Sequence, residues 1–184
     1  MLSIADNYFS QFELPVGYDI DLDRLNGQFR ELQTIVHPDR YAAAGDEQRL
    51  RAIKLSSYLN EAYETLKSPL RRAGYLLKLQ GVDVEQVDQS DLDPELLFEQ
   101  IALRESLAEL PKDESALDRL DELSRTTGDR LARRQLEFAA CLVGRSAAGS
   151  PEGGDLAQAK KLFHELQFLT KLQAEIEKAE DAIV

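Results

Sequence analysis

The 184-residue sequence has a single cysteine, no tryptophan and two histidines, and it is also poor in glycine and proline. A lone cysteine, Cys141, excludes both a disulfide framework and a cysteine-cluster metal site. Two histidines far apart in the sequence do not form a ligand set, so we expect no bound metal and no cofactor. No apolar run is long enough to cross a bilayer, and we expect no signal or transit peptide after Met1. We therefore expect a cytoplasmic protein.

Basic residues are outnumbered in the second half of the chain. Residues 1–80 carry ten Lys and Arg against eleven Asp and Glu, whereas residues 81–184 carry twelve against twenty-three, which accounts for the net charge of −12. This acidity argues against nucleic acid and against an anionic membrane as partners. Solubility alone would explain the charge, but the change near residue 81 also suggests two parts with different tasks.

Abundant Leu and Ala, together with apolar residues at three-four spacing, predict an all-α protein. A first helix should open in the acidic cluster at residues 19–23 and end near His37, because Pro38 disfavours helical geometry in the residue before it. A second helix should open at residues 45–47. Two apolar stripes joined by a loop of roughly ten residues predict an antiparallel hairpin. The stripes are Leu22, Leu25, Phe29, Leu32 and Val36, and Ala52, Leu55, Leu59, Ala62 and Leu66, with Tyr8, Phe9 and Phe12 as a lid.

The remaining chain predicts a short helix and then a bundle. The short helix should start at Pro69 and stop at Gly81, after which "VDVEQVDQSDLDP" is acidic and aperiodic. Three further helices are expected at residues 94–110, 115–143 and 155–182, with an exposed flexible loop in "GRSAAGSPEGGD". The predicted domains are a helical hairpin domain (residues 1–80), a linker (residues 81–93) and a three-helix bundle (residues 94–184).

Two helices of the bundle carry more apolar side chains than one core face needs. Their core stripes are expected at Leu96, Leu103, Leu107 and Leu110, and at Leu162, Leu166, Leu169 and Ile176. On a helical wheel of about 100° per residue, the side chains that point away from these stripes are Leu97, Phe98, Ile101, Glu105, Glu109 and Phe168. Such a second face either packs on the hairpin or a wide core, or forms an exposed partner site bordered by acids.

The loop of the predicted hairpin, "TIVHPDRYAAAGDE", has side chains suited to recognition. Pro38 limits the shapes of the turn, because its ring fixes φ and removes a backbone donor. Asp39 presents a carboxylate that can accept a charge-assisted, bidentate hydrogen bond from an arginine, and the His37 ring can donate or accept.

This hairpin, with His-Pro-Asp in its loop and "NEAYETL" in its second helix, resembles a J-domain. The segments "SPLRRAGYLLKLQG", "LLFEQIALRESLAEL" and "LFHELQFLTKL" extend the resemblance over nearly the whole chain, to the bacterial HscB family. These proteins are J-domain co-chaperones of iron–sulfur cluster biogenesis. The resemblance implies a J-domain that stimulates ATP hydrolysis by a DnaK-like chaperone, HscA. It also implies a C-terminal bundle that binds the cluster scaffold protein IscU and delivers it to that chaperone.

The same resemblance assigns residues to both contacts. The expected chaperone-binding residues are His37, Pro38, Asp39, Arg40 and Arg30, and the expected scaffold-binding residues are Leu97, Phe98, Ile101, Glu105, Glu109 and Phe168. Two positions depart from the family pattern, since Arg40 stands where a lysine is usual and Ala102 where some relatives have a glutamate. The two side chains at the first position differ in shape and donor geometry, although the charge is kept.

Other classes of protein fit less well. An enzyme would need more than His37 and Asp39, and the sequence has neither a Gly-rich phosphate loop nor a nucleophile in a turn, so we expect no catalytic residues. His164 is expected at the surface, and Cys141, in "FAACLVG", is expected to be a buried structural thiol. The alternative function is a general J-domain co-chaperone or a helical adaptor for unfolded clients. General J-proteins commonly carry Gly/Phe-rich or zinc-binding regions, and neither is present.

Overall fold

The computed structural model describes residues 4–41, 45–84, 94–111, 113–142 and 155–183, which form helices, turns and connecting segments and no strand. The predicted all-α fold is therefore confirmed. The chain divides into two compact units, residues 1–76 and residues 77–184. The division falls four residues before the predicted end of the first domain. Residues 85–93, which are most of the predicted linker, and residues 144–154, which are most of the Gly/Ser-rich loop, lie outside the described residues.

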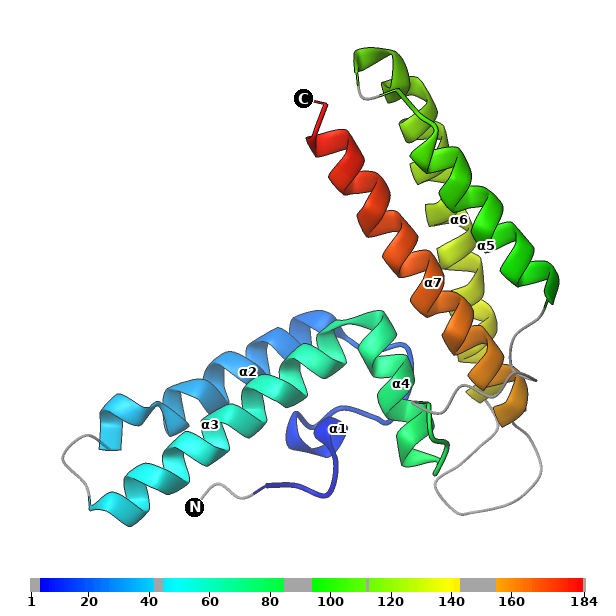
Figure 1. Cartoon of the computed structure of the whole chain (residues 1–184). Coiled ribbons are helices and arrows are strands. Elements are labelled where there is room, and N and C mark those ends of the chain that lie inside the picture. Colours follow the sequence, from blue (N-terminus) through cyan, green and yellow to red (C-terminus); the bar gives the residue numbers. More distant parts are fainter. Residues whose placement is uncertain (1–3, 42–44, 85–93, 112, 143–154, 184) are drawn as a thin grey trace. The chain divides into compact units, whose positions relative to one another are not determined.

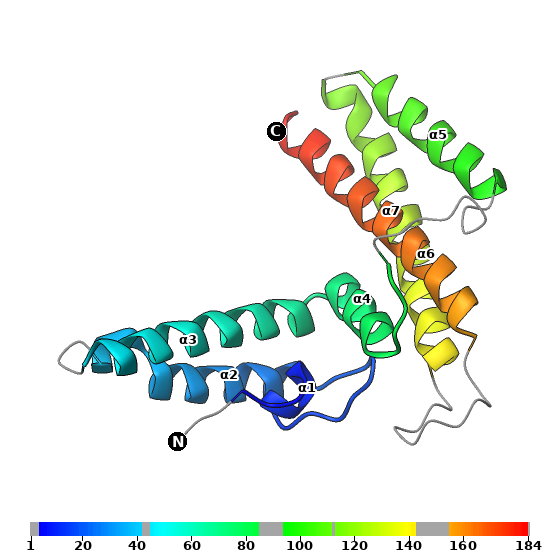
Figure 2. The ribbon, with the colours of Figure 1, turned by 60° about the horizontal axis from the view of Figure 1, so that its bottom comes forward.

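The first unit is built on a helical hairpin. Helix α1 (Tyr8–Gln11) precedes α2 (Leu22–Val36), and a short 3-10 helix, η1 (Pro38–Tyr41), leads towards α3 (Asp46–Lys67). The Asp21 carboxylate accepts a hydrogen bond from the Arg24 backbone N–H at 2.9 Å and so caps the start of α2. Helix α2 ends before Pro38, as predicted, since His37 has an extended ψ of 127°. Figures 1 and 2 show α2 and α3 side by side.

The facing stripes of α2 and α3 form the core of the first unit. The buried members are Leu25, Leu32, Val36, Ala52, Leu55, Leu59, Ala62 and Leu66. Phe9 and Phe12 are also buried, and the Phe12 ring meets the Phe29 ring edge-on at 6.4 Å, which confirms the predicted aromatic lid. Leu22, the first residue of the predicted stripe, is exposed. It lies in the first turn of α2, and the apolar contact begins one turn later at Leu25.

Helix α4 (Pro69–Leu79) is tied to the hairpin by a buried arginine. The Arg72 guanidinium donates to the carbonyl oxygens of Leu66, Tyr18 and Lys67 at 2.7, 2.6 and 3.4 Å, and it lies 5.5 Å from the centre of the Tyr18 ring. Leu66 and Lys67 are the last residues of α3, whose carbonyls have no partner within the helix. Burial lowers the pKa of Arg72 from its usual value. One side chain therefore closes α3 and holds the loop before α2.

The second unit contains three long helices. Helix α5 (Pro94–Ala108) is followed by a 3-10 turn, η3 (Glu114–Ala116), by α6 (Leu117–Leu142) and by α7 (Leu156–Asp181), whose start is capped by the Asp155 carboxylate. These bounds confirm the predicted helices to within a few residues. Figures 1 and 2 show α6 and α7 packed along each other, with α5 beside them. The core cluster is Ala116, Leu120, Leu123, Phe168, Leu169, Leu172 and Ile176, with Leu103, Leu107 and Leu110 of α5 partly buried against it.

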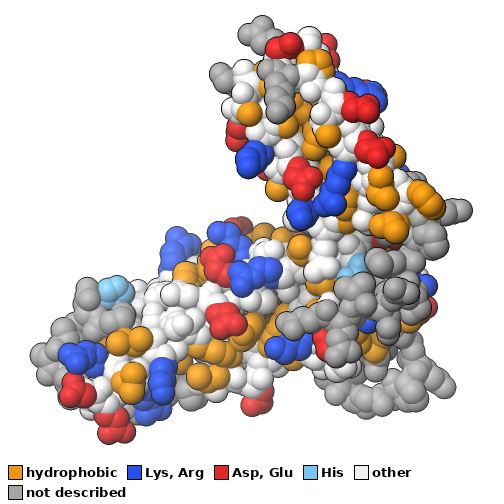
Figure 3. Space-filling model, viewed as in Figure 1, with side chains coloured by type: hydrophobic (Ala, Val, Ile, Leu, Met, Phe, Trp, Pro, Cys, Tyr) orange, Lys and Arg blue, Asp and Glu red, His pale blue; other side chains and the backbone are white. Residues whose placement is uncertain are grey.

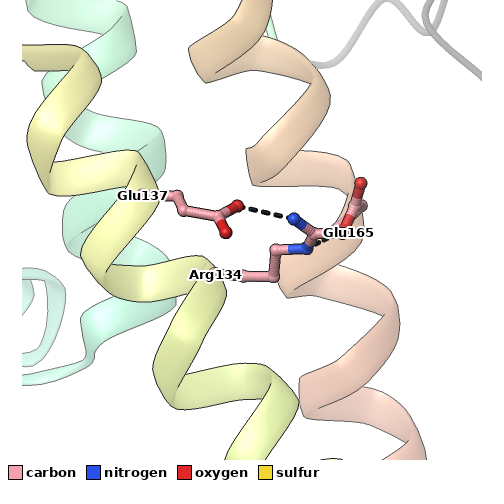
Figure 4. Close-up of polar contacts among 3 residues, drawn as sticks. All are labelled: Arg134, Glu137 and Glu165. Carbon is pink, nitrogen blue, oxygen red and sulfur yellow. Dashed lines mark hydrogen bonds and ion pairs between the residues drawn. The ribbon is translucent and has the colours of Figure 1, made fainter.

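A charged triad also joins α6 to α7 (Figure 4). Arg134 of α6 contacts Glu137 in its own helix, from Nη1 to Oε2, and Glu165 of α7, from Nε to Oε2 at 2.6 Å. Burial raises the pKa of Glu165, and the positive charges of Arg134 and Arg130 oppose that shift. Hydrogen bonding to Glu137 raises the pKa of Arg134. The partly buried Glu165 carboxylate is thus compensated by a cation from the neighbouring helix.

We predict that Arg72→Met destabilises the protein by about 3 kcal/mol, because the carbonyl oxygens of Tyr18 and Leu66 would lose a charged donor in a buried place. Urea unfolding followed by circular dichroism measures the change. The matched control is Arg71→Met, since Arg71 is the exposed neighbour in the same helix and its loss should cost under about 0.5 kcal/mol. Equal losses in both variants would contradict the structural role of Arg72.

Candidate protein-interaction sites

The turn after α2 is held in place by two of its own side chains. Arg40 donates from Nη1 to the carbonyl oxygen of Thr34 at 3.0 Å, and the Tyr41 hydroxyl donates to that of Ile35 at 3.3 Å. The Arg40 backbone N–H donates to the His37 carbonyl at 3.0 Å. These bonds satisfy carbonyls at the end of α2 that the helix itself leaves unpaired. The turn is therefore anchored to α2 rather than extending freely from it.

His37 is exposed on this anchored turn. Its side chain lines an open hollow of about 390 Å³ together with Gln33, Thr34 and Arg40. The side chains of Pro38 and Asp39 lie outside those that the structure describes. Sequence reasoning missed the anchoring role of Arg40, although a basic residue just after a helix C-terminus is a recognised signal for binding the last carbonyls. The Arg40 guanidinium carries further N–H donors besides the one that bonds to the Thr34 carbonyl.

Arg30, the other predicted chaperone-binding cation, is exposed in the middle of α2. Its Nε donates to the Asn26 carbonyl at 3.2 Å, one turn back in the same helix. The structure therefore places Arg30 about two turns before the His37 turn on α2, within the first unit.

An apolar face on α5 is exposed, as the sequence predicted for three of its residues. Leu97, Phe98 and Ile101 are 46%, 73% and 46% exposed. Glu105 and Glu109, which follow at helical spacing, are exposed as well. Figure 3 shows hydrophobic side chains gathered near the N-terminal end of α5. No side chain that the structure describes on α5 is fully buried, so this helix keeps an apolar surface while Leu103, Leu107 and Leu110 attach it to the core.

The expectation that Phe168 belongs to this exposed face is wrong. Phe168 is only 9% exposed and is part of the core cluster of the second unit. The Arg104 guanidinium of α5 lies 5.6 Å from the centre of its ring, and Arg104 Nε is 3.8 Å from the Glu175 carboxylate of α7. A helical wheel shows in which direction each side chain points from its own helix, but it does not show how far the core extends around that helix. Here α5 packs on α7 and covers the side to which Phe168 points.

Two other expectations need correction. His164 is buried rather than at the surface; its Nδ1 lies 3.1 Å from Oε1 of Gln167, and its ring meets that of Phe163 at 5.7 Å. Cys141 is partly rather than fully buried, and burial raises the pKa of its thiol. The described part of the chain holds no group of three or more His, Cys, Asp or Glu residues able to bind a metal ion. It also holds no helix long and apolar enough to cross a membrane.

A helical hairpin with an anchored His-Pro-Asp turn, followed by a second helical unit with an exposed apolar face, is the arrangement that the sequence resemblance to a J-domain co-chaperone predicts. The comparisons agree. Residues 92–177 match the family model described as the HSCB C-terminal oligomerisation domain. The Co-chaperone protein HscB homolog of Shewanella amazonensis is 35% identical over 178 residues, which cover 97% of this chain and 99% of that protein. The homolog of Cupriavidus taiwanensis is 37% identical over 180 residues, covering 98% and 97%.

Solved structures show a similar all-α fold. The chaperone HscB from Vibrio cholerae matches with a TM-score of 0.82 and 34% identity, covering 95% of this chain and 98% of that one. Human co-chaperone HscB matches with a TM-score of 0.84 at 23% identity, covering 97% and 84%, which shows a common fold. The chain belongs to the HscB family of co-chaperones, and a co-chaperone role in iron–sulfur cluster assembly follows from that membership.

The corrected position of Phe168 leads to a stability prediction. Phe168→Ala should cost about 3 kcal/mol, because it removes a buried ring from the core, whereas Phe98→Ala should cost well under 1 kcal/mol. The two variants remove the same atoms from helices of one unit, so each is the matched control for the other. Denaturant unfolding curves give both values. A large loss in Phe98→Ala would show that the face on α5 is covered.

Proposed function

We propose that this protein stimulates the ATPase of a DnaK-like chaperone of the HscA type through His37, Pro38 and Asp39. We further propose that it binds an iron–sulfur cluster scaffold of the IscU type on α5 and delivers it to that chaperone in the cytoplasm. The observation that carries the proposal is the exposure of two different recognition surfaces on two compact units, the anchored turn and the apolar face of α5. One chain can then hold two partners at once.

The turn is suited to recognition because its backbone is restrained before a partner arrives. The hydrogen bonds of Arg40 and Tyr41 to the end of α2 reduce the conformations that binding would have to select. In the proposal, Asp39 accepts a bidentate hydrogen bond from an arginine of the chaperone, and His37 supplies a second polar contact. Arg30 adds positive charge on the preceding helix, which favours an acidic surface on the partner.

The proposed scaffold site on α5 has an apolar centre and an acidic border. Leu97, Phe98 and Ile101 would be desolvated by the scaffold, and Glu105 and Glu109 would pair with its cations at the rim. At position 102 an exposed alanine offers no charge, so the charged part of the contact rests on these two glutamates. In this proposal Phe168 does not contact the scaffold. Its ring packs against the Arg104 guanidinium and so helps to hold α5 in place.

Self-association of the C-terminal unit is a further part of the proposal. It is supported by the description of the matching family model, which names an oligomerisation domain over residues 92–177. These residues include α5, α6 and most of α7. Binding of a second copy would have to leave the apolar face of α5 accessible if the same unit is also to hold the scaffold.

His37→Gln is predicted to abolish stimulation of the chaperone ATPase while leaving the melting temperature nearly unchanged, because the side chain is exposed and outside the hairpin core. Steady-state ATP hydrolysis with and without the variant measures the effect. Ser57→Ala, an exposed change on α3, is the control and should stimulate normally. A large fall in melting temperature would mean that His37 has a structural role instead.

Leu97→Ala and Phe98→Ala are each predicted to weaken scaffold binding at least tenfold, since a central apolar contact is worth roughly 2 kcal/mol or more. Titration calorimetry with the scaffold protein gives the affinities. Both variants should still stimulate the chaperone's ATPase in the absence of scaffold. Leu136→Ala, at an exposed leucine on α6, is the matched control and should bind the scaffold normally. Unchanged affinity in both α5 variants would place the scaffold elsewhere.

A further inference from the structure

Helix α5 is apolar on more than one side. The leucines that attach it to the core of the second unit are Leu103, Leu107 and Leu110. Its exposed large apolar side chains are Leu97, Phe98 and Ile101. A helix of this kind has no single amphipathic stripe, so apolar burial alone does not fix which side faces the core. Another contact has to select the rotation of α5 about its own axis.

Two glutamates of α5 oppose a full reversal of the helix. Glu105 follows Ile101 by four residues, and Glu109 follows Glu105 at the same spacing, so the three side chains lie along one side of α5. Turning that side into the core would bury two carboxylates that have no partners there, which is unfavourable. The charges of this side therefore keep it in water.

A smaller rotation, which would turn Leu97 towards the core, is opposed at one position only. Arg104 stands seven residues after Leu97, which is about two helical turns, so the two side chains point in nearly the same direction. A rotation that buries Leu97 therefore carries Arg104 inward as well. Ala108, one turn further along, is uncharged. Among these three described side chains of α5, the guanidinium is the only group that resists burial.

Arg104 is also bound to α7 in the observed rotation. The centre of its guanidinium lies 5.6 Å from the centre of the Phe168 ring, and its Nε is 3.8 Å from Oε2 of Glu175. Contacts of this type at partly exposed positions add little to stability. A rotation of α5 would break both of them, however, and a polar contact that forms in one packing arrangement only selects that arrangement.

We propose that Arg104 is a positioning residue that fixes the rotation of α5, and that its contacts with Phe168 and Glu175 keep Leu97 directed outward. This inference rests on the proposed scaffold site for its function, because that site is presented only in the observed rotation. The rotation itself is a property of the free protein. Two other roles for Arg104 would behave differently. A residue that contacts the scaffold directly would not affect the rotation, and a residue that merely attaches α5 would release the whole helix when removed.

Tryptophan fluorescence of the free full-length chain tests the rotation, because the native sequence has no tryptophan. Leu97→Trp and Phe98→Trp each place a single reporter on α5. Adding Arg104→Leu to the Leu97→Trp protein should shift the emission to shorter wavelength and lower acrylamide quenching at least twofold, because the reporter turns inward. The Phe98→Trp reporter should stay exposed, since Phe98 lies about 100° further round the helix.

Two control variants and a binding measurement complete the test. Arg104→Lys keeps a cation near Phe168 and Glu175, so it should leave both reporters unchanged. Ser106→Leu adds a leucine at an exposed position on the other flank of the core stripe and should also leave them unchanged. In chains without a reporter, Arg104→Leu should weaken scaffold binding at least threefold, whereas Arg104→Lys should bind within twofold of the native protein.

The outcomes separate this inference from the proposed function. If neither reporter responds to Arg104→Leu, the rotation is not set by Arg104 and the inference is overturned, whether or not scaffold binding weakens. If both reporters become more exposed, Arg104 attaches α5 as a whole, which also overturns it. Inward movement of the Leu97 reporter with unchanged scaffold affinity supports the inference and overturns the proposed scaffold site on α5 instead.

Discussion

Every long helix of this protein has to bury one apolar stripe, and a helix cannot do so alone. In the first unit α2 and α3 bury their stripes on each other, which forces the chain to reverse direction at His37. The reversal is possible because Pro38 ends α2 and the side chains of Arg40 and Tyr41 satisfy its last carbonyls. At the other end of the hairpin the buried Arg72 does the same for α3. The recognition turn is thus a consequence of how the hairpin closes.

The two candidate sites lie on surfaces that the packing of the helices does not bury. A hairpin buries its facing stripes and exposes its turn, so polar groups on the turn remain available to a partner. Helix α5 is apolar on more than one side, and its attachment through partly buried leucines and Arg104 uses only one of them. The other side leaves Leu97, Phe98 and Ile101 exposed to water. Exposed apolar surface of this kind lowers solubility unless a partner covers it. Both sites are therefore separate from the core that supports them.

Several features could be predicted because they depend on residues close together in sequence. The caps at Asp21 and Asp155 and the stop at Pro38 give helix bounds within a few residues. The exposed side of α5 could also be predicted, because Leu97, Phe98 and Ile101 point away from the core stripe of that same helix. The exposed position predicted for Phe168 from the same periodicity is wrong, and so is the surface position expected for His164. Periodicity says which way a side chain points, whereas burial depends on whether another helix happens to lie there.

The sequence by itself determined the all-α fold, because helix periodicity and helix caps are local signals that tertiary contacts did not override. The change of charge near residue 81 indicated the two-part organisation, and the resemblance of the hairpin and of three later segments indicated the family. Only the tertiary structure decided the roles of long polar side chains. Arg72 meets carbonyls of residues 18 and 66, Arg104 meets Phe168 and Glu175, and Arg134 meets Glu165. Each of these partners is distant in sequence or on another element, and an arginine can reach in many directions. Its partner is therefore set by packing, which no pattern along one helix records.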